Sequence, residues 1–316
     1  MHTIDVRELR KAFAAPKKKG GTEMVAVDGL SFAISPGEKV AFIGPNGAGK
    51  STTLKMLCGI LHPSSGEALV AGFVPWKQTR ALAHKLGIVF GQRSQLWPSL
   101  PVRDSFDMLA AIYSLEGSIA RQRRDRLVDI FGIVDLLGQT ARSLSLGQRM
   151  RCDIVASLLH GPDILFLDEP TIGLDVTAKA LLRDHLNDLA EQDSTTIILT
   201  SHDTGDIEHI CRRVILIDHG RKVVDEDLGE LRRSFMGRKI LRLVTDEESP
   251  QSPVSEAEIA QSGPHSLTLV VDTARLPVDR AVAACLANLS VKDLTIEDPP
   301  LEDVIKRIYA QQGRGA

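Results

Sequence analysis

A stretch of nine residues, GPNGAGKST at positions 44–52, carries the residue types that bind phosphate. Its glycines let successive backbone N–H groups surround phosphate oxygens without interference from Cβ atoms. Lys50 is placed to reach the β- and γ-phosphates of a nucleotide, and the hydroxyl of Ser51 is placed to hold Mg²⁺. An apolar run precedes the stretch and a helical pattern follows it, so the positive end of a helix faces the same anion. We therefore predict a nucleotide phosphate site rather than a glycine-rich turn with an incidental lysine.

Two adjacent acids, Asp168 and Glu169, end the apolar run ILFLDE at positions 164–169. A carboxylate at the end of a buried strand is the group that nucleotide hydrolases bring beside Mg²⁺. Successive strand side chains point to opposite faces, so the two acids can serve different tasks. We expect Asp168 to serve the metal and Glu169 to orient and polarise the attacking water. Two solvated acids are the simpler alternative, but Pro170 and Thr171 continue a recognisable pattern.

These residues need a scaffold, and apolar runs alternate with helical patterns up to about position 225. That alternation is typical of an α/β domain with a largely parallel sheet between helices. Strands are predicted at positions 39–44, 88–91, 164–169, 195–202 and 213–220. Helical spacing recurs at Leu54, Leu57, Cys58 and Leu61, and again at Leu182, His185, Leu186 and Leu189.

Two changes in the sequence pattern divide the chain further. Strand signals stop between positions 109 and 144, which indicates a helical subdomain, at about 93–160, inserted into a nucleotide-binding domain of residues 1–235. The polar stretch at 245–264, rich in Ser and Pro, is predicted to be an exposed loop. Strand and helix patterns on both sides of it predict a small α+β accessory domain over residues 238–316.

Composition argues against several classes of partner and location, although a local basic patch remains possible. The net charge of -3 over 316 residues provides no global basic field for nucleic acid. No apolar run approaches the roughly 18 to 20 residues that a spanning helix needs, and the start of the chain lacks the order of a secretory signal. We therefore expect a cytoplasmic protein. The cysteines, which have no paired spacing, are expected to be small core residues: Cys58, Cys152, Cys211 and Cys285.

Residues 1–230 resemble the ATP-binding subunits of ABC transporters. The phosphate loop, FGQ ending at Gln92, LSLGQ at 144–148, ILFLDEP, GLD at 173–175 and TSH ending at His202 occur in that family's order. The LSLGQ turn narrows the match from nucleoside triphosphatases in general to this superfamily. The resemblance implies a P-loop ABC nucleotide-binding fold, ATP and Mg²⁺ as cofactors, and ATP hydrolysis.

The resemblance also implies a role for each matching position. Gln92 would sense Mg²⁺ and the attacking water, and its loop would meet a transmembrane partner. His202 would contact the γ-phosphate, and Phe13 is the candidate for stacking on adenine, although a long insert follows it. The implied nucleotide contacts in the loop are Asn46, Gly47, Gly49, Lys50, Ser51 and Thr52, and the implied metal contacts are Ser51, Gln92 and Asp168.

In this family two subunits enclose two ATP molecules, and each nucleotide lies between the phosphate loop of one subunit and the LSGGQ-like turn of the other. Ser145, Gly147 and Gln148 would then contact ATP held by the partner, and Asp175 would cross the dimer seam. The chain departs from the family at Leu146, where glycine is usual. We expect Leu146 to adopt ordinary dihedral angles, with Gly147 keeping the contact.

Details of the motifs look most like the ATPases of bacterial exporters for drugs, viologens and natural products, in which the permease is a separate chain. The expected partners are a second ATPase subunit, most simply in a homodimer, and transmembrane permease subunits, with the protein peripheral on the inner face of the membrane. Pairing with a different ATPase subunit stays open. Two alternatives also remain: a soluble ABC ATPase that acts on ribosomes or DNA, and an importer ATPase.

Overall fold

The computed structural model describes residues 2–14, 23–90, 93–192, 195–234 and 237–312 of the chain. The chain divides into two compact units, Met1–Asp227 and Leu228–Ala316. The second unit therefore begins with the helix α8 (Leu228–Ser234), which the sequence assigned to the first domain.

A six-stranded sheet forms the centre of the first unit, with strand order β5-β6-β7-β3-β8-β9. The first five strands are parallel, and β9 pairs with β8 in the antiparallel sense. Parallel strands buried on both faces read as continuous apolar runs, which is why the sequence located them. The strands are β3 (Lys39–Ile43), β5 (Leu86–Phe90), β6 (Ile164–Asp168), β7 (Thr196–Thr200), β8 (Arg213–Asp218) and β9 (Arg221–Asp227).

A second, antiparallel sheet of order β2-β1-β4 shares a hydrophobic core with the central sheet and α1. Its strands are β1 (Ile4–Phe13), β2 (Met24–Ile34) and β4 (Ser65–Val70). Helix α1 (Lys50–Leu57) buries Leu54 and Leu57 in this core but ends earlier than the apolar spacing predicts. Gly59 has a φ of 73°, which terminates the helix and places Leu61 beyond it.

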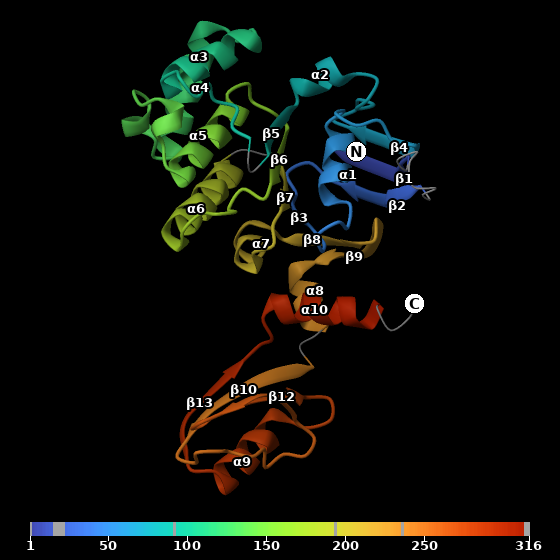
Figure 1. Cartoon of the computed structure of the whole chain (residues 1–316), viewed down its shortest axis with the longest axis vertical. Helices are drawn as coiled ribbons and strands as arrows, with labels where there is room; N and C mark the ends of the chain where they lie inside the picture. Colours follow the sequence, from blue (N-terminus) through green and yellow to red (C-terminus); the bar gives the residue numbers. More distant parts are fainter. Residues whose placement is uncertain (1, 15–22, 91–92, 193–194, 235–236, 313–316) are drawn as a thin grey trace. The chain divides into compact units, whose positions relative to one another are not determined.

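The other helices of the first unit lie mostly on one side of the central sheet. In Figure 1 the green helices α3 to α6 gather there, whereas α1 and the three-stranded sheet lie on the opposite side. The predicted helix over Leu182, Leu186 and Leu189 is α6, and those three side chains are buried. The helices are α2 (Thr79–Ala83), α3 (Val102–Ile112), α4 (Gly117–Ile130), α5 (Leu146–Leu158), α6 (Val176–Gln192) and α7 (Thr204–Ile210), with short 3₁₀ turns at Val134–Leu136 and Ala141–Ser143.

The second unit has its own core between α9 and an antiparallel sheet of order β11-β12-β10-β13. One prediction was wrong, because residues 258–263 of the expected loop form the edge strand β11. Its side chains are exposed or half-buried, so they carry no apolar alternation, and only backbone pairing with β12 makes the strand. The remaining elements are β10 (Arg238–Thr245), β11 (Glu258–Gly263), β12 (Ser266–Asp272), α9 (Val278–Asn288), β13 (Val291–Glu297) and α10 (Leu301–Gln312).

All four cysteines are buried and unpaired, as expected for small core residues. Burial raises the pKa of the Cys152 thiol to about 12, so this thiol is protonated at neutral pH. Within the described residues, no helix combines the length and the apolar character needed to cross a membrane.

Candidate functional site

The phosphate loop connects β3 to α1 at the carboxyl edge of the central sheet. Gly47 and Gly49 have φ values of 83° and 102°, a region that residues with a Cβ rarely adopt. The loop also packs closely, because a Cβ on Gly49 would lie 2.4 Å from the carbonyl oxygen of Ala26. Glycine is therefore required at position 49 by both backbone conformation and space.

The ammonium group of Lys50 lies inside this loop. Its Nζ donates hydrogen bonds to the carbonyl oxygens of Gly44 at 2.6 Å and Pro45 at 3.2 Å. Burial lowers the pKa of Lys50, while the nearby carboxylates of Glu169 and Asp168 oppose that shift. The loop thus holds a desolvated cation in its centre, where an anion would meet little screening by water.

Asp168 ends β6 and lies directly beside the start of α1. Its carboxylate accepts a hydrogen bond from the Ser51 hydroxyl at 3.2 Å and another from the Thr200 hydroxyl at 2.6 Å. Asp168 and Thr200 are register partners in the parallel pairing of β6 with β7, which explains their contact. The sheet therefore brings Asp168 to Ser51 across 117 positions of sequence.

Glu169 begins the loop after β6 and has a φ of 55°, unusual for a residue with a side chain. Its backbone N–H is held by the carbonyl and hydroxyl oxygens of Thr200, each at 3.1 Å. Its Oε2 accepts a hydrogen bond from the backbone N–H of His202 at 3.3 Å, and the ring Nε2 of His202 lies 3.3 Å from Oε1. Burial raises the pKa of the Glu169 carboxyl, opposed mainly by His202.

These groups share one cavity of about 420 Å³, lined by residues from five separate segments. It brings together ten of the predicted site residues: Phe13, Asn46, Gly47, Gly49, Lys50, Ser51, Thr52, Asp168, Glu169 and His202. The sequence missed the apolar wall of this cavity, which comes from Met24, Val25 and Ala26 of β2. Met24 is 64% exposed and is the register partner of Phe13, so together they form an open apolar ledge.

The oxygen atoms of two side chains in this cavity are suitable ligands for Mg²⁺ bound with a nucleotide. Mg²⁺ prefers oxygen ligands and is commonly held by one or two protein groups, with phosphates and water completing the shell. Ser51 and Asp168 supply two such oxygens within 3.2 Å of each other. Gln92, the third predicted metal contact, lies outside the described residues. No cluster of three or more His, Cys, Asp or Glu side chains suited to a metal occurs in the described part of the chain.

The LSLGQ turn lies outside this cavity and begins α5. The Ser145 hydroxyl accepts a hydrogen bond from the backbone N–H of Gln148 at 3.3 Å, and the Gln148 side chain accepts one from the N–H of Ser145 at 2.9 Å. This capping box fixes the helix start and uses the Gln148 side-chain oxygen. Ser145, Gly147 and Gln148 are absent from the cavity lining, so within this chain the turn does not reach the phosphate loop.

Leu146 is the first residue of α5 and does not have a positive φ, as expected. A Cβ placed on Gly173, in the segment after Glu169, would lie 3.0 Å from Cδ2 of Leu146. A Cβ on Gly147 would likewise lie 3.0 Å from the Cβ of Ala178 on α6. The turn therefore packs against the GLD segment, whose Asp175 accepts a hydrogen bond from the Ala178 N–H at 2.8 Å.

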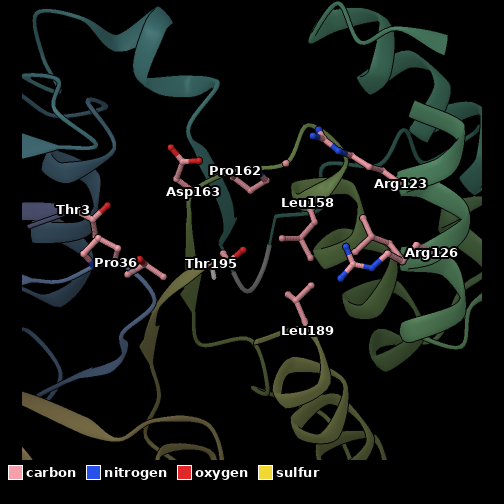
Figure 2. A pocket seen from close by; sticks show the side chains of 12 residues that line it. Thr3, Pro36, Arg123, Arg126, Leu158, Pro162, Asp163, Leu189 and Thr195 are labelled. Carbon is pink, nitrogen blue, oxygen red and sulfur yellow. The ribbon is translucent and has the colours of Figure 1, made fainter. Parts of the chain in front are cut away.

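A different cavity, of about 510 Å³, lies where β6 and β7 begin, at the far end of those strands from Asp168. Figure 2 shows Arg123 and Arg126 of α4 on one side of it, with Thr3 and Asp163 on the other. The Asp163 carboxylate pairs with Lys85 at 3.1 Å. None of the predicted site residues lines this cavity, which is therefore distinct from the phosphate site.

Comparison with known proteins identifies the family to which similar sequences belong. The sequence profile described as ABC transporter matches residues 27–172. The chain is 30% identical over 287 residues to the daunorubicin/doxorubicin resistance ATP-binding protein DrrA of Streptomyces peucetius, covering 88% of this chain and 86% of that protein. It is 36% identical over 222 residues to the Nod factor export ATP-binding protein I of Burkholderia pseudomallei, covering 70% of each.

Solved structures give the same picture of the fold. The structure of cbiO1 from Clostridium perfringens, part of the ABC transporter complex cbiONQ, is 29% identical with a TM-score of 0.63, covering 74% of this chain and 94% of that one. A dimeric bacterial ABC transporter cassette is 26% identical with a TM-score of 0.61, covering 71% of this chain and 98% of that one. The expected nucleotide-binding fold is thereby confirmed.

Proposed function

This chain belongs to the ABC transporter family and is an ATPase, and we propose that it supplies the energy for a membrane exporter. The proposed substrate is ATP with Mg²⁺, and the permease that carries the exported molecule is proposed to be a separate chain. The observation that carries the proposal is the meeting of Lys50, Ser51, Asp168, Glu169 and His202 in one cavity.

ATP binding is proposed to begin at the phosphate loop. Lys50 exchanges its contacts with Gly44 and Pro45 for the β- and γ-phosphates, while the loop N–H groups and the N-terminus of α1 face the same oxygens. Adenine stacks on Phe13, beside the exposed side chain of Met24. Bound Mg²⁺ would neutralise the developing phosphate charge, and Ser51 and Asp168 are the described groups that fit it.

Glu169 is proposed to act as the general base. Its carboxylate orients a water and accepts a proton from it as the water attacks the γ-phosphorus, and ADP leaves. Burial raises the pKa of Glu169, which makes the ionised carboxylate a stronger base. His202, whose backbone N–H and ring both lie 3.3 Å from that carboxylate, orients it and contacts the γ-phosphate.

A complete site is proposed to need a second ATPase subunit. Ser145, Gly147 and Gln148 do not line the cavity of their own chain, and the turn that contains them opens a helix whose N-terminus favours an anion. Two copies facing each other would place this turn over the partner's ATP, with Asp175 at the seam. ATP-driven closure of that dimer would then drive the permease, and ADP formation would release it.

The direction of transport is proposed from the relatives. DrrA is named for drug resistance and the Nod factor protein for export, and the match to DrrA covers 88% of this chain. An importer ATPase would present the same catalytic residues, so identification of the permease separates the two.

The test uses Glu169→Gln, which keeps the shape of the side chain but removes its basicity. ATP should still bind, and turnover should fall by about 10² to 10⁴, the usual contribution of a general base. Glu67→Gln, an exposed acid on β4, is the matched control and should hydrolyse ATP at the wild-type rate. Wild-type turnover in Glu169→Gln would contradict the assigned base.

The same variant tests the partner. Trapped with ATP and Mg²⁺ and recovered from its native membranes, Glu169→Gln should copurify with a polytopic permease. Recovery of ribosomes or nucleic acid without a membrane protein would overturn the transporter proposal in favour of a soluble ABC ATPase.

A further inference from the structure

A buried carboxylate outside the nucleotide cavity, that of Asp206 on α7, gathers donors from three separate segments. Asp206 has 0% of its surface exposed. It accepts hydrogen bonds from the hydroxyl of Thr171, from the hydroxyl of Ser201 at 2.7 Å, and from the guanidinium of Arg183 at 2.6 and 2.7 Å. Thr171 and Ser201 are themselves 2% and 3% exposed, so the carboxylate and both hydroxyls are shielded from water, whereas the Arg183 side chain is 20% exposed.

Two of these donors adjoin the proposed catalytic residues. Thr171 follows Glu169 by two positions, and Ser201 immediately precedes His202. The Ser201 oxygen also accepts a hydrogen bond from the backbone N–H of Asp203 at 3.0 Å. The residues on both sides of His202 are therefore tied to the same hydroxyl, which is in turn tied to Asp206.

The third donor connects this cluster to α6, the helix that begins directly after Asp175. The Arg183 guanidinium pairs with Asp206 and also with Asp203 at 3.2 Å. Asp203 receives a second ion pair from Lys179 at 2.6 Å and caps α7 through the N–H of Gly205. Three segments, the one after Glu169, the one around His202, and α6, thus converge on two carboxylates.

Stability alone is a weak explanation for such an arrangement. The desolvation of a carboxylate and a guanidinium offsets most of the electrostatic attraction between them. Well-packed apolar side chains often stabilise a fold as much. Hydrogen bonds are directional, so the charged cluster fixes the orientation of each donor group in a way that apolar packing does not. The donors that are oriented in this way belong to the chain segments that carry Glu169 and His202.

We propose that Asp206 is a positioning residue for ATP hydrolysis, which holds the segments carrying Glu169 and His202 in a fixed relation to each other and to α6. This inference rests on the proposed roles of Glu169 and His202. Asp206 itself touches no substrate. It acts through Thr171 and Ser201, so loss of either hydroxyl lets the base and the histidine move relative to the γ-phosphate, with little effect on ATP binding.

The experiment removes one hydroxyl at a time and leaves the Asp206–Arg183 ion pair in place. Thr171→Val is nearly isosteric and lacks the donor, whereas Thr171→Ser retains it; Ser201→Ala removes the other. We expect kcat to fall about tenfold to a hundredfold in Thr171→Val and Ser201→Ala, since misplacement by about 1 Å has an effect of that size. KM and the Kd for a fluorescent ATP analogue should change less than about twofold, and Thr171→Ser should recover most of kcat.

The matched control is Ser157→Ala on α5. Ser157 is 2% exposed, and its hydroxyl donates one hydrogen bond, to the carbonyl oxygen of Ile154 at 2.7 Å. It therefore reports what loss of a buried serine hydroxyl does to folding, away from the Asp206 cluster. Its kcat should match that of the wild type.

The outcomes separate this inference from the function on which it rests. Absence of ATPase activity in the wild type, or wild-type activity in Glu169→Gln, would contradict the proposed function. If Glu169→Gln is inactive but Ser201→Ala and Thr171→Val keep the kcat of Ser157→Ala, the positioning role is wrong. A raised KM with unchanged kcat, or failure of Thr171→Ser to recover activity, would also overturn it.

Discussion

Acidification should destabilise the first unit through one buried histidine, His160, just beyond the end of α5. The residue is 8% exposed, its ring stacks on Tyr113 with 3.9 Å between centroids, and its Nε2 lies 2.9 Å from the carbonyl oxygen of Leu86. Its Nδ1 is buried without a hydrogen-bond partner. Burial lowers the pKa of His160 from 6.5 to about 4, opposed by the hydrogen bond to Leu86.

The change in the free energy of unfolding with pH follows from proton linkage at His160. Between the two pKa values the unfolded chain binds a proton at this ring and the folded chain does not, so unfolding becomes easier as pH falls. From about pH 7.5 to about pH 5.5 this histidine alone should remove about 1.3 kcal/mol from the free energy of unfolding. The contribution is complete above the unfolded pKa and is lost progressively as pH falls toward the folded one.

The assay is urea unfolding at the two pH values, followed by tryptophan fluorescence. Both tryptophans of the chain, Trp76 and Trp97, belong to the unit that contains His160, so the signal reports on that unit. His160→Gln keeps an amide donor and cannot titrate. Because the remaining histidines are common to both proteins, the wild type should lose about 1.3 kcal/mol more than the variant. Equal losses in the two proteins would refute the reasoning.

Further expectations concern the LSLGQ turn and the packing of the sheet. Leu146→Gly should not raise ATPase activity, because Leu146 has ordinary dihedrals and packs on Gly173; a large gain in steady-state turnover would mean that the native turn is compromised. Ser145→Ala removes a helix cap and should lower the free energy of unfolding by about 1 kcal/mol in the same urea assay. Gly87→Ala should lower it by about 1 to 3 kcal/mol, since the added Cβ would lie 2.6 Å from the carbonyl oxygen of Ser157; an unchanged midpoint would show that the strand shifts freely.

The central strands and the phosphate loop could be predicted because their signals are local. A buried parallel strand is apolar along its whole length, and β3, β6 and β8 begin where the apolar runs predict. The glycines and Lys50 of the loop are close in sequence, so their spacing alone predicts a site for one anion. The edge strand β11 had no such signal, because only its backbone joins the sheet.

The sequence by itself therefore determined which residues are proposed to bear the chemistry of this ATPase: Lys50, Ser51, Asp168, Glu169 and His202. Tertiary structure decided what holds them. The register of β6 with β7 places Thr200 against Asp168, and Asp206 collects hydroxyls that lie 35 and 5 positions away. Residue type and spacing are enough to predict the phosphate loop, because its groups are close together in the sequence. A hydrogen bond between distant segments depends on how strands and helices pack. Short sequence patterns do not predict which residues far apart in the chain come into contact.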